Sequence, residues 1–433
     1  LPTANNSFFY PSASLGVVIT EALGMSENKV LPFGKLRLSY ASVGHDAPSY
    51  ALGKYFSGTF VGDGWTSGVN FPYNGVAGFS VDDVLGSNAL RPEKNNTIEI
   101  GTDLRFIKNR IGVDFTFYRS RAVDQILAIP VAGSSGYTNQ FMNAGTVSNT
   151  GFEITLNATP VKSKDFRWDM QVNFTRNKNM VVSLREGIDN IFLGGFEGSS
   201  VRNVAGQPYG QIYGGTFLRD ANGNHIIESD TNSAFYGFPI DSGKEEAIGN
   251  PNPDFLCGFS NTLTWKGISL NILFDFRKGG QMWNGTIGAL ANFGMSKVTE
   301  DRDVDYTFEG VKGTLDGDGN LVLQDENGNA GTVTNDVVIN RNQQWFLTNG
   351  GGFGNVAEQF IQETSWIRLR EVSLSYSLPT KLLEKTPIAG LNVGISGRNL
   401  LLITPYEGID PETNLMGSVN AQGLDYFNMP NTR

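Results

Sequence analysis

The stretch FRWDMQVNFT (166–175) decides the fold class of this chain. Every even position from 166 to 174 is apolar, and every odd position from 167 to 175 is polar. Because successive side chains of a β-strand point to opposite faces, this segment would have one apolar and one polar face. Strands of soluble proteins usually run about 5–6 residues, whereas a tilted strand that crosses a bilayer needs about 9–11. The stretch is therefore typical of a transmembrane β-strand.

The same alternation recurs in nine or ten stretches, and the connectors between them are alternately short and long. In the stretch 365–378 the apolar side chains change parity near Arg370, which indicates a β-bulge. The predicted strands are 36–43, 97–106, 111–120, 151–159, 166–176, 255–265, 268–276, 365–378 and 391–399.

Composition agrees with this pattern. The chain has 433 residues with 53 Gly, 29 Phe and 14 Tyr, and only 18% of its residues are charged. It contains no run of about 18 consecutive apolar residues, which excludes membrane-spanning helices. The net charge of −10 argues against nucleic acid as a partner, because such binding needs clustered Lys and Arg. The single cysteine, Cys257, excludes an internal disulfide.

The alternation of connectors predicts how the strands cross the membrane. Outer-membrane barrels have short periplasmic turns and long extracellular loops. A soluble β-sandwich or propeller also has alternating strands, but connectors as long as 177–254 and 278–364 are uncommon in compact soluble domains. We therefore predict an all-β protein: a transmembrane antiparallel β-barrel in the outer membrane of a Gram-negative bacterium.

Several phrases, taken together and in order, resemble the SusC/RagA family of TonB-dependent outer-membrane transporters. The first segment spans a predicted hairpin, and the second begins with NAG and contains a predicted strand. The third contains the sequence GNPNPDF, and the last two overlap the last predicted strands. They are RPEKNNTIEIGTDLRFIKNRIGVDFTFY (91–118), NAGTVSNTGFEITLNATP (143–160), GNPNPDFLCGFSNTLTWKGISL (249–270), SWIRLREVSLSYSLP (365–379) and GRNLLLITPYEGIDPETN (397–414).

This resemblance implies a barrel of roughly 22 strands filled by an N-terminal plug domain and covered by a SusD-like lipoprotein. It also implies import of large nutrients, such as oligosaccharides or peptides, powered through TonB. On this resemblance residues 1–433 are the C-terminal part of the barrel, and the plug, the TonB box and the final strand are absent from the chain. TonB would act through that missing N-terminal region. A natural barrel of about ten strands is the alternative.

Other functions stay open from the sequence. The chain could be a non-transporting scaffold in a larger outer-membrane complex, a passive porin or a surface adhesin. An enzyme is not expected, because the only histidines, His45 and His225, lie in predicted loops and cannot build a His-dependent triad or a multi-His metal site. The expected partners are the SusD-like lipoprotein, TonB and outer-membrane lipid.

Eight charged residues within the predicted strands are candidates for the barrel interior. Charged side chains are costly on the lipid face of a barrel, so we predict that they face the lumen. There they would pair with one another, hold the plug or line the solute path. They are Glu99, Asp103, Arg105, Asp114, Glu153, Arg167, Asp169 and Asp275.

Aromatic residues divide into two groups. Rings near strand ends, among them Trp265 and Trp366, are predicted to form the interfacial girdle. Rings in the two long connectors are candidates for contact with a solute or with a SusD-like lid. These candidates are Phe192, Phe196, Tyr209, Tyr213, Trp283 and Trp345.

Two loop segments resemble calcium loops weakly. An EF-hand needs Gly at position six and Glu at position twelve, but DGDGNLVLQDEN (316–327) has Leu321 and Asn327 there, and DANGNHIIESD (220–230) has His225 at its sixth position. The Asn-Gly and Asp-Gly pairs favour turn formation instead, and no cofactor is expected. The candidate oxygen donors are Asp220, Asn222, Asn224, Asp316, Asp318 and Asn320.

Overall fold

The structure is a computed structural model that describes residues 1–25, 27–49, 51–58, 60–61, 69–81, 83–196, 198–301, 304–340, 343–417 and 421–429. Its residues form two compact units. The first comprises Leu1–Ala158, Thr175–Ile191 and Val204–Tyr209, and the second comprises Thr159–Phe174, Phe192–Asn203 and Gly210–Arg433.

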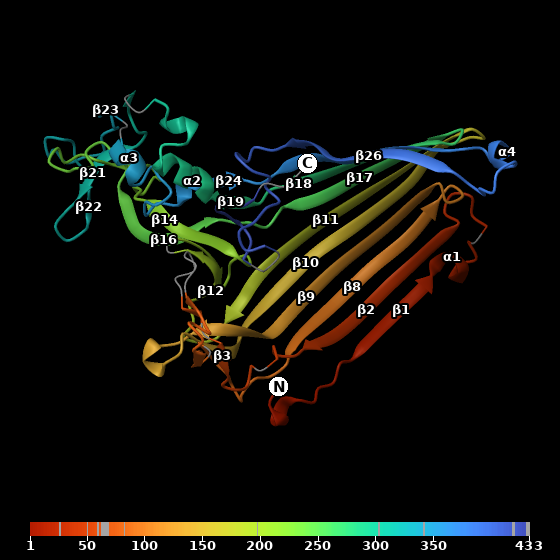
Figure 1. Ribbon diagram of the computed structural model, residues 1–433, viewed down its shortest axis with the longest axis horizontal. Helices are drawn as coiled ribbons and strands as arrows, with labels where there is room; N and C mark the ends of the chain where they lie inside the picture. Colours follow the sequence, from red (N-terminus) through yellow and green to blue (C-terminus); the bar gives the residue numbers. More distant parts are fainter. Residues whose placement is uncertain are drawn as a thin grey trace. The chain divides into compact units, whose positions relative to one another are not determined.

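Long antiparallel strands dominate the first unit, and each pairs with its neighbour in the chain (Figure 1). Their order is β1-β2-β8-β9-β10. This is the order that successive hairpins produce, because antiparallel strands can be joined directly by a turn. The strands are β1 (Ser12–Val18), β2 (Phe33–His45), β8 (Glu93–Phe106), β9 (Ile111–Pro130) and β10 (Asn139–Lys162).

The second unit has the same construction in the order β17-β18-β25-β26. Strand β11 (Phe166–Leu184) contributes its first half to the second unit and its second half to the first. Ten long strands among the described residues thus pair in this order, nine of them at predicted positions. Those of the second unit are β17 (Phe255–Trp265), β18 (Ile268–Lys278), β25 (Trp366–Ser377) and β26 (Asn392–Ile403).

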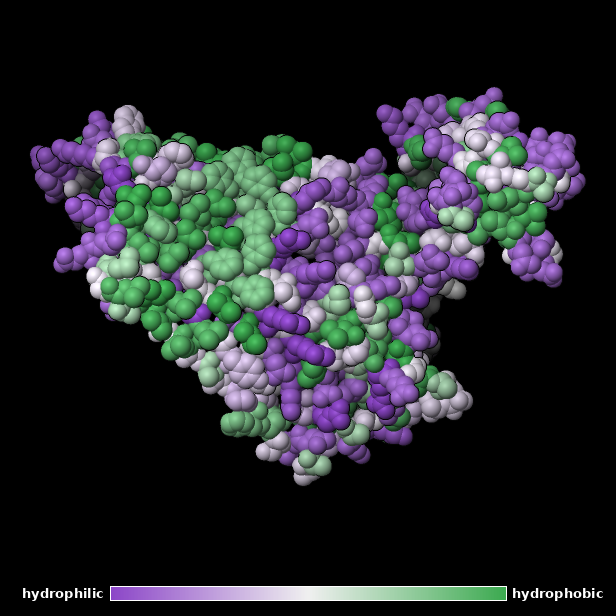
Figure 2. Space-filling model, turned by 180° about the vertical axis from the view of Figure 1, so that it is seen from behind, coloured by the Kyte–Doolittle hydropathy of each residue, from purple (hydrophilic) through white to green (hydrophobic). Residues whose placement is uncertain are grey.

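The register of the first unit aligns apolar side chains in rows. Leu38 pairs with Ile100, Ile100 with Phe117, and Phe117 with Phe152, so one apolar row crosses four strands. Leu38, Ile100 and Phe117 are nevertheless 45%, 44% and 37% exposed. On the face drawn in Figure 2, hydrophobic side chains gather into a broad area beside hydrophilic ones. An apolar face of this extent is suited to lipid rather than to water.

The predicted strands are confirmed, and most extend further than the alternation indicates. Strand β17 has the predicted bounds, whereas β9 continues to Pro130 and β10 begins at Asn139. Barrel strands often continue beyond the bilayer, where the alternation is no longer imposed by lipid. Strand β1 was not predicted, because its sequence SASLGVV contains few large apolar residues.

The short connectors are tight turns. Lys266 and Gly267 alone join β17 to β18, with φ angles of 45° and 89°. Positive φ at both central residues is typical of the type I′ turn, whose twist matches that of a hairpin. Residues 107–110 join β8 to β9, and α4 (Thr380–Leu383) lies between β25 and β26.

The long connectors of the second unit fold into small sheets and helices of their own. Two apolar clusters pack here: one around Ile212, Trp283 and Leu424, the other around Phe217 and Trp345. The elements are β12 (Asn190–Phe196), β13 (Ser199–Val204), β14 (Gln211–Phe217), β15 (Ile226–Glu228), β16 (Asp241–Gly249), β19 (Gln281–Asn284), α2 (Gly285–Asn292), β20 (Asp305–Tyr306), β21 (Val311–Leu315), β22 (Leu321–Val322), β23 (Ile339–Asn340), α3 (Gln343–Leu347), β24 (Ile361–Glu363) and β27 (Leu424–Asp425).

Short elements also fill the connectors of the first unit. They are α1 (Ile19–Ala22), β3 (Phe56–Gly58), β4 (Phe60–Val61), β5 (Val69–Asn70), β6 (Phe79–Val81) and β7 (Val84–Leu85). None of the helices among the described residues has the length and apolarity that a membrane span requires.

Candidate functional site

The polar face of the first unit contains a bidentate ion pair. Arg37 of β2 donates to both carboxylate oxygens of Asp114 of β9, at 2.9 and 2.7 Å. Its guanidinium reaches across β8 at Gly101, where a Cβ atom would lie only 3.0 Å from Arg37 Nη2. The missing side chain at Gly101 therefore leaves room for the pair, which holds three strands in register.

The other predicted residues of this unit make weaker contacts. Arg105 lies 3.4 Å from Asp103 and stacks over the ring of Phe33. Glu99 accepts a long hydrogen bond of 3.5 Å from the Ser39 hydroxyl. Glu153 lies in β10 directly opposite Thr116 of β9.

In the second unit Asp169 of β11 joins two neighbours. Arg167 Nε lies 2.6 Å from Asp169 Oδ2, and the Thr159 hydroxyl donates to Asp169 Oδ1 at 2.7 Å. Because Arg167 and Asp169 are two residues apart on one strand, they lie on the same face. The sequence predicts this shared face, and the structure adds the contact with Thr159.

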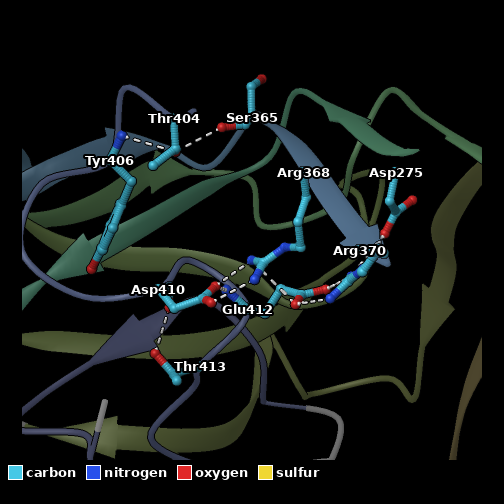
Figure 3. A network of polar contacts seen from close by, with 9 residues as sticks. All are labelled: Asp275, Ser365, Arg368, Arg370, Thr404, Tyr406, Asp410, Glu412 and Thr413. Carbon is cyan, nitrogen blue, oxygen red and sulfur yellow. Dashed lines mark hydrogen bonds and ion pairs between the residues drawn. The ribbon is translucent and has the colours of Figure 1, made fainter. Parts of the chain in front are cut away.

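A larger network is centred on the bulge in β25. Arg370 has no paired residue in either neighbouring ladder, where the registers pass from Leu369 to Glu371, so the bulge predicted from the parity change is confirmed. Because Arg370 follows Arg368 by two residues, the two side chains lie on the same face of the strand. Arg370 donates to Asp275 of β18, with Nη2 2.7 Å from Oδ2, and also makes two hydrogen bonds to Glu412 (Figure 3).

Arg368 is the buried member of this network and is only 3% exposed. It donates to both carboxylate oxygens of Asp410 at 2.8 and 2.6 Å, and it lies 3.2 Å from Glu412. A buried guanidinium requires such partners, because an unpaired charge in a desolvated place is costly. Figure 3 shows both arginines extending from one strand toward the carboxylates of the segment that follows β26.

Hydrogen bonds fix that segment to the end of β25. The Thr404 hydroxyl donates to the Ser365 carbonyl at 2.8 Å, and the backbone N–H of Tyr406 donates to the Thr404 hydroxyl at 3.1 Å. The Thr413 hydroxyl donates to the Asp410 carbonyl at 2.7 Å. The chain after β26 is therefore positioned by charge and by backbone contacts, and it presents Glu412 beside β18 and β25.

The sequence identified Asp275 but missed the other members of the network. Arg368, Asp410 and Glu412 lie in phrases that resemble the family, yet nothing in their spacing shows that residues 42 positions apart meet. The available signal is the pair of arginines two residues apart at the change of parity. Two charged residues two positions apart on one strand are predicted to point to the same face.

The predicted connector rings have different surroundings. Trp283 and Trp345 are 4% and 6% exposed and belong to the two apolar clusters, so burial leaves little surface of these rings for a solute or partner. Phe196 packs against Trp283 and Tyr426. Their size and apolarity make them core residues within the folded connectors.

The remaining connector rings are more accessible. Phe192 is 50% exposed. Tyr213 of β14 lies beneath the guanidinium of Arg202, 5.5 Å from its ring centroid, and the backbone N–H of Tyr209 donates to Asn179. Contact of Phe192, Tyr209 and Tyr213 with a solute stays a prediction.

The strand-end rings also differ from one another. Trp265 is 52% exposed beside Lys266, as a girdle residue would be. The girdle prediction is wrong for Trp366, which is only 6% exposed and contacts the guanidinium groups of Arg277 and Arg368. Trp366 is the first residue of β25 and lies on the same face as Arg368, which carries the polar network.

The candidate calcium donors form hydrogen bonds within their own turns. Asp220 Oδ1 accepts the backbone N–H groups of Asn222 and Asn224, and Oδ2 accepts the Asn224 side chain at 2.9 Å. Asp316 makes the same three contacts with Asp318 and Asn320. These hydrogen bonds lower the pKa of both Asp220 and Asp316, the strongest coming from Asn224 and Asn320.

A third turn of this kind follows at Asp325, with Asn327 and Asn329. Within the described residues no group of three or more His, Cys, Asp or Glu side chains could hold a metal ion. The geometry is that of the turn-forming role favoured by the Asp-Gly and Asn-Gly pairs.

One buried cation supports the connector fold near these turns. The side chain of Lys312 in β21 is 4% exposed, and its Nζ lies 2.5 Å from Glu326 and 2.5 Å from Asp336. Hydrogen bonding to Asp336 and Glu326 raises the pKa of Lys312, and Lys312 in turn lowers the pKa of each carboxyl. Residues distant in the sequence thus fix β21.

Long amphipathic strands in hairpin order, with an exposed apolar face and paired charges on the other, define the class as a transmembrane β-barrel wall. Residues 2–254 match the family model described as TonB dependent receptor-like, beta-barrel. This match covers more than half of the chain, and the chain therefore belongs to that family of outer-membrane proteins. The family consists of receptors and transporters rather than enzymes.

Individual relatives agree with this assignment. The chain is 26% identical over 461 residues to TonB-dependent receptor P3 of Formosa agariphila, a match that covers 99% of this chain and 41% of the relative. It is also 26% identical over 435 residues to TonB-dependent receptor SusC of Bacteroides thetaiotaomicron, covering 93% of this chain and 37% of SusC. The resemblance to the SusC/RagA family is thus confirmed.

Solved structures show the same fold. The structure of the RagAB peptide transporter matches with a TM-score of 0.66 at 19% identity, over 99% of this chain and 43% of that chain. The RagAB peptide importer in its open-open state matches with a TM-score of 0.63. The chain spans less than half the length of these relatives.

Proposed function

We propose that this chain is the C-terminal part of the barrel of a TonB-dependent transporter, which imports large nutrients across the outer membrane. The plug and the TonB box would belong to the part of the protein outside this chain, and a SusD-like lipoprotein would cover the long loops. The proposed cargo is an oligosaccharide or a peptide. Family membership and the spans of the relatives support this assignment.

The observation that carries the proposal is the division of the strands into two faces. Rows such as Leu38–Ile100–Phe117 form an exposed apolar face. Paired charges such as Arg37 with Asp114 and Arg370 with Asp275 form the other. A wall of this kind separates lipid from a wet interior through which a polar solute can pass.

The test is uptake by cells that lack the complete gene. A deletion strain and its complemented parent receive labelled oligopeptides or labelled oligosaccharides, each with and without a protonophore. The proposal expects loss of uptake of one of these two classes, restored by the complete gene and abolished by the protonophore. Unchanged growth and uptake for every nutrient would refute import.

The same strains separate transport from the other functions. Protonophore-insensitive uptake would indicate a passive porin. Normal uptake together with loss of a stable outer-membrane complex would indicate a scaffold. Co-purification of a lipoprotein in equal amount with the complete protein would support the SusD-like partner.

A further inference from the structure

A cavity of about 180 Å³ lies in the second unit beside the Arg368–Arg370 network. Its walls come from five segments: residues 251–253 before β17, the end of β18 with the start of β19, Thr364 just before β25, and residues 411–413 and 422–423 after β26. The polar lining residues are Asn252, Arg277, Gln281, Thr364, Glu412, Thr413 and Gln422.

Arg277 is the cation of this cavity. It lies in β18 on the same face as Asp275, two residues away. Its Nη2 donates to the Pro251 carbonyl at 2.7 Å, and its guanidinium stacks on Trp366, 5.1 Å from the ring centroid. No ion pair among the described residues includes Arg277. Its charge is therefore held in place by carbonyl and ring contacts without a carboxylate.

The neighbouring arginines form hydrogen bonds with the nearby carboxylates. Arg368 binds Asp410 in bidentate geometry, and Arg370 binds Asp275. Glu412 lines the cavity, but both of its carboxylate oxygens accept hydrogen bonds from Arg370. The carboxylates next to the cavity are thus engaged elsewhere, and Arg277 keeps donor capacity toward the cavity.

A second observation points to a missing acceptor. Thr364 lines the cavity and is 1% exposed, yet its hydroxyl has no hydrogen-bond partner among the described residues. Gln281 is held by its oxygen, which accepts the backbone N–H of Asn250 at 3.0 Å, while its amide nitrogen donates to no described group. A buried donor without an acceptor is unfavourable, so the Thr364 hydroxyl indicates a missing acceptor, and the Arg277 guanidinium and the exposed Gln281 amide lie around the same cavity.

We propose that this cavity binds the carboxylate group of a solute. A guanidinium with a planar donor fork, a hydroxyl and an amide are the groups that recognise a carboxylate. Whole small-molecule ligands need about 300–1,000 Å³, whereas a cavity of about 150 Å³ accepts a group the size of benzene. The cavity therefore takes one acidic end of a larger molecule. The inference deepens the proposed import by naming an acidic class of cargo.

Binding is measured on the complete purified protein in detergent at pH 7, with acetate as the probe. Ligand-observed NMR follows the acetate methyl signal, which broadens when acetate binds. Two further pairs distinguish the source of the carboxylate: triglycine against triglycine amide, and glucuronate against glucose. The proposal expects the charged member of at least one pair to displace acetate and its uncharged partner not to do so.

Three variants test the site. Arg277→Gln should weaken acetate binding about tenfold or more, and Thr364→Val should weaken it about three- to tenfold. Thr364→Val is the sharper variant, because the Thr364 hydroxyl makes no hydrogen bond with the described residues that its loss could break. Lys278→Gln is the matched control: it removes a cation from the next residue, on the opposite face of β18, and should leave acetate binding unchanged.

The inference is overturned if acetate fails to bind, or if it binds equally to wild type and Thr364→Val. Equal weakening by Lys278→Gln would also overturn it, because binding would then follow net charge. The measurement needs neither TonB nor a plug cycle. Failure of import with intact carboxylate binding would therefore refute the proposed function alone, and import without carboxylate binding would refute only this inference.

Discussion

Arg370 of β25 and Asp275 of β18 are joined across neighbouring strands at the point where β25 bulges. Arg370 lies two residues after Arg368, on the face that Asp275 also occupies. Its guanidinium reaches Glu412 as well. A local irregularity thus becomes the site where two strands and a distant loop segment meet. The network joins Arg368, Arg370, Asp275, Asp410 and Glu412 (Figure 3).

Replacing Arg370 with Met should destabilise the protein, because Asp275 loses its partner and Glu412 loses its main one. These side chains are about one quarter exposed, so we expect a loss of about 2 kcal/mol rather than the full cost of a buried unpaired charge. Urea unfolding of the protein in lipid vesicles measures the change. Arg105→Met, at a more exposed pair, should cost less than about 1 kcal/mol. Equal losses would contradict the central role of Arg370.

Replacing Arg368 with Lys should loosen the segment after β26 while keeping the charge. Lysine cannot form the two parallel hydrogen bonds that Arg368 makes with Asp410. Amide hydrogen exchange across residues 404–413 should accelerate by about tenfold or more. Arg398→Lys is the control, since the Arg398 side chain is 77% exposed and lies 3.5 Å from Glu371. Unchanged exchange in the Arg368 variant would show that backbone contacts alone hold the segment.

The Lys312 cluster should make the connector fold sensitive to acid. Lys312 lowers the pKa of Glu326 and of Asp336, so their stabilising effect is complete above the ordinary carboxyl values of about 4. It is lost as the pH falls through the lowered values, since both carboxyls then become protonated. The raised pKa of Lys312 keeps its charge throughout this range.

Hydrogen exchange of β21, corrected for intrinsic rates, should show weaker protection at pH 2.5 than at pH 6. Lys312→Met should abolish that difference by removing the cation that both carboxyls contact. A pH effect of the same size in wild type and variant would locate its source outside this cluster.

Replacing Gly267 with Ala should impair the two-residue turn between β17 and β18. Gly267 has a φ of 89°, and an added Cβ would lie 2.8 Å from the Ser377 carbonyl oxygen. We expect a loss of about 1–2 kcal/mol from the left-handed conformation alone, measured by urea unfolding in vesicles. Gly258→Ala in β17 is the matched control, because nothing lies within 4 Å of its added Cβ. The turn assignment fails if both substitutions have the same effect.

Local sequence determined the strands and their faces. Alternation of side chains is a property of neighbouring residues, so it predicted β17 with its observed bounds and the bulge at Arg370. The same alternation located Asp275 and Asp114 among the paired charges. Lipid imposes this pattern on every strand that crosses it, so each strand can be predicted from its own sequence.

Only the tertiary structure decided which distant groups meet. Arg368 and Asp410 are 42 residues apart, and no periodicity connects them. Trp283 lies in a connector, and only the folded connectors show that its ring belongs to an apolar core. Trp366, which the sequence predicts for the girdle, lies instead beside the guanidinium of Arg277. The sequence by itself thus determined an amphipathic wall and its family. The cavity of Arg277 and Thr364 exists only because five separate segments converge there.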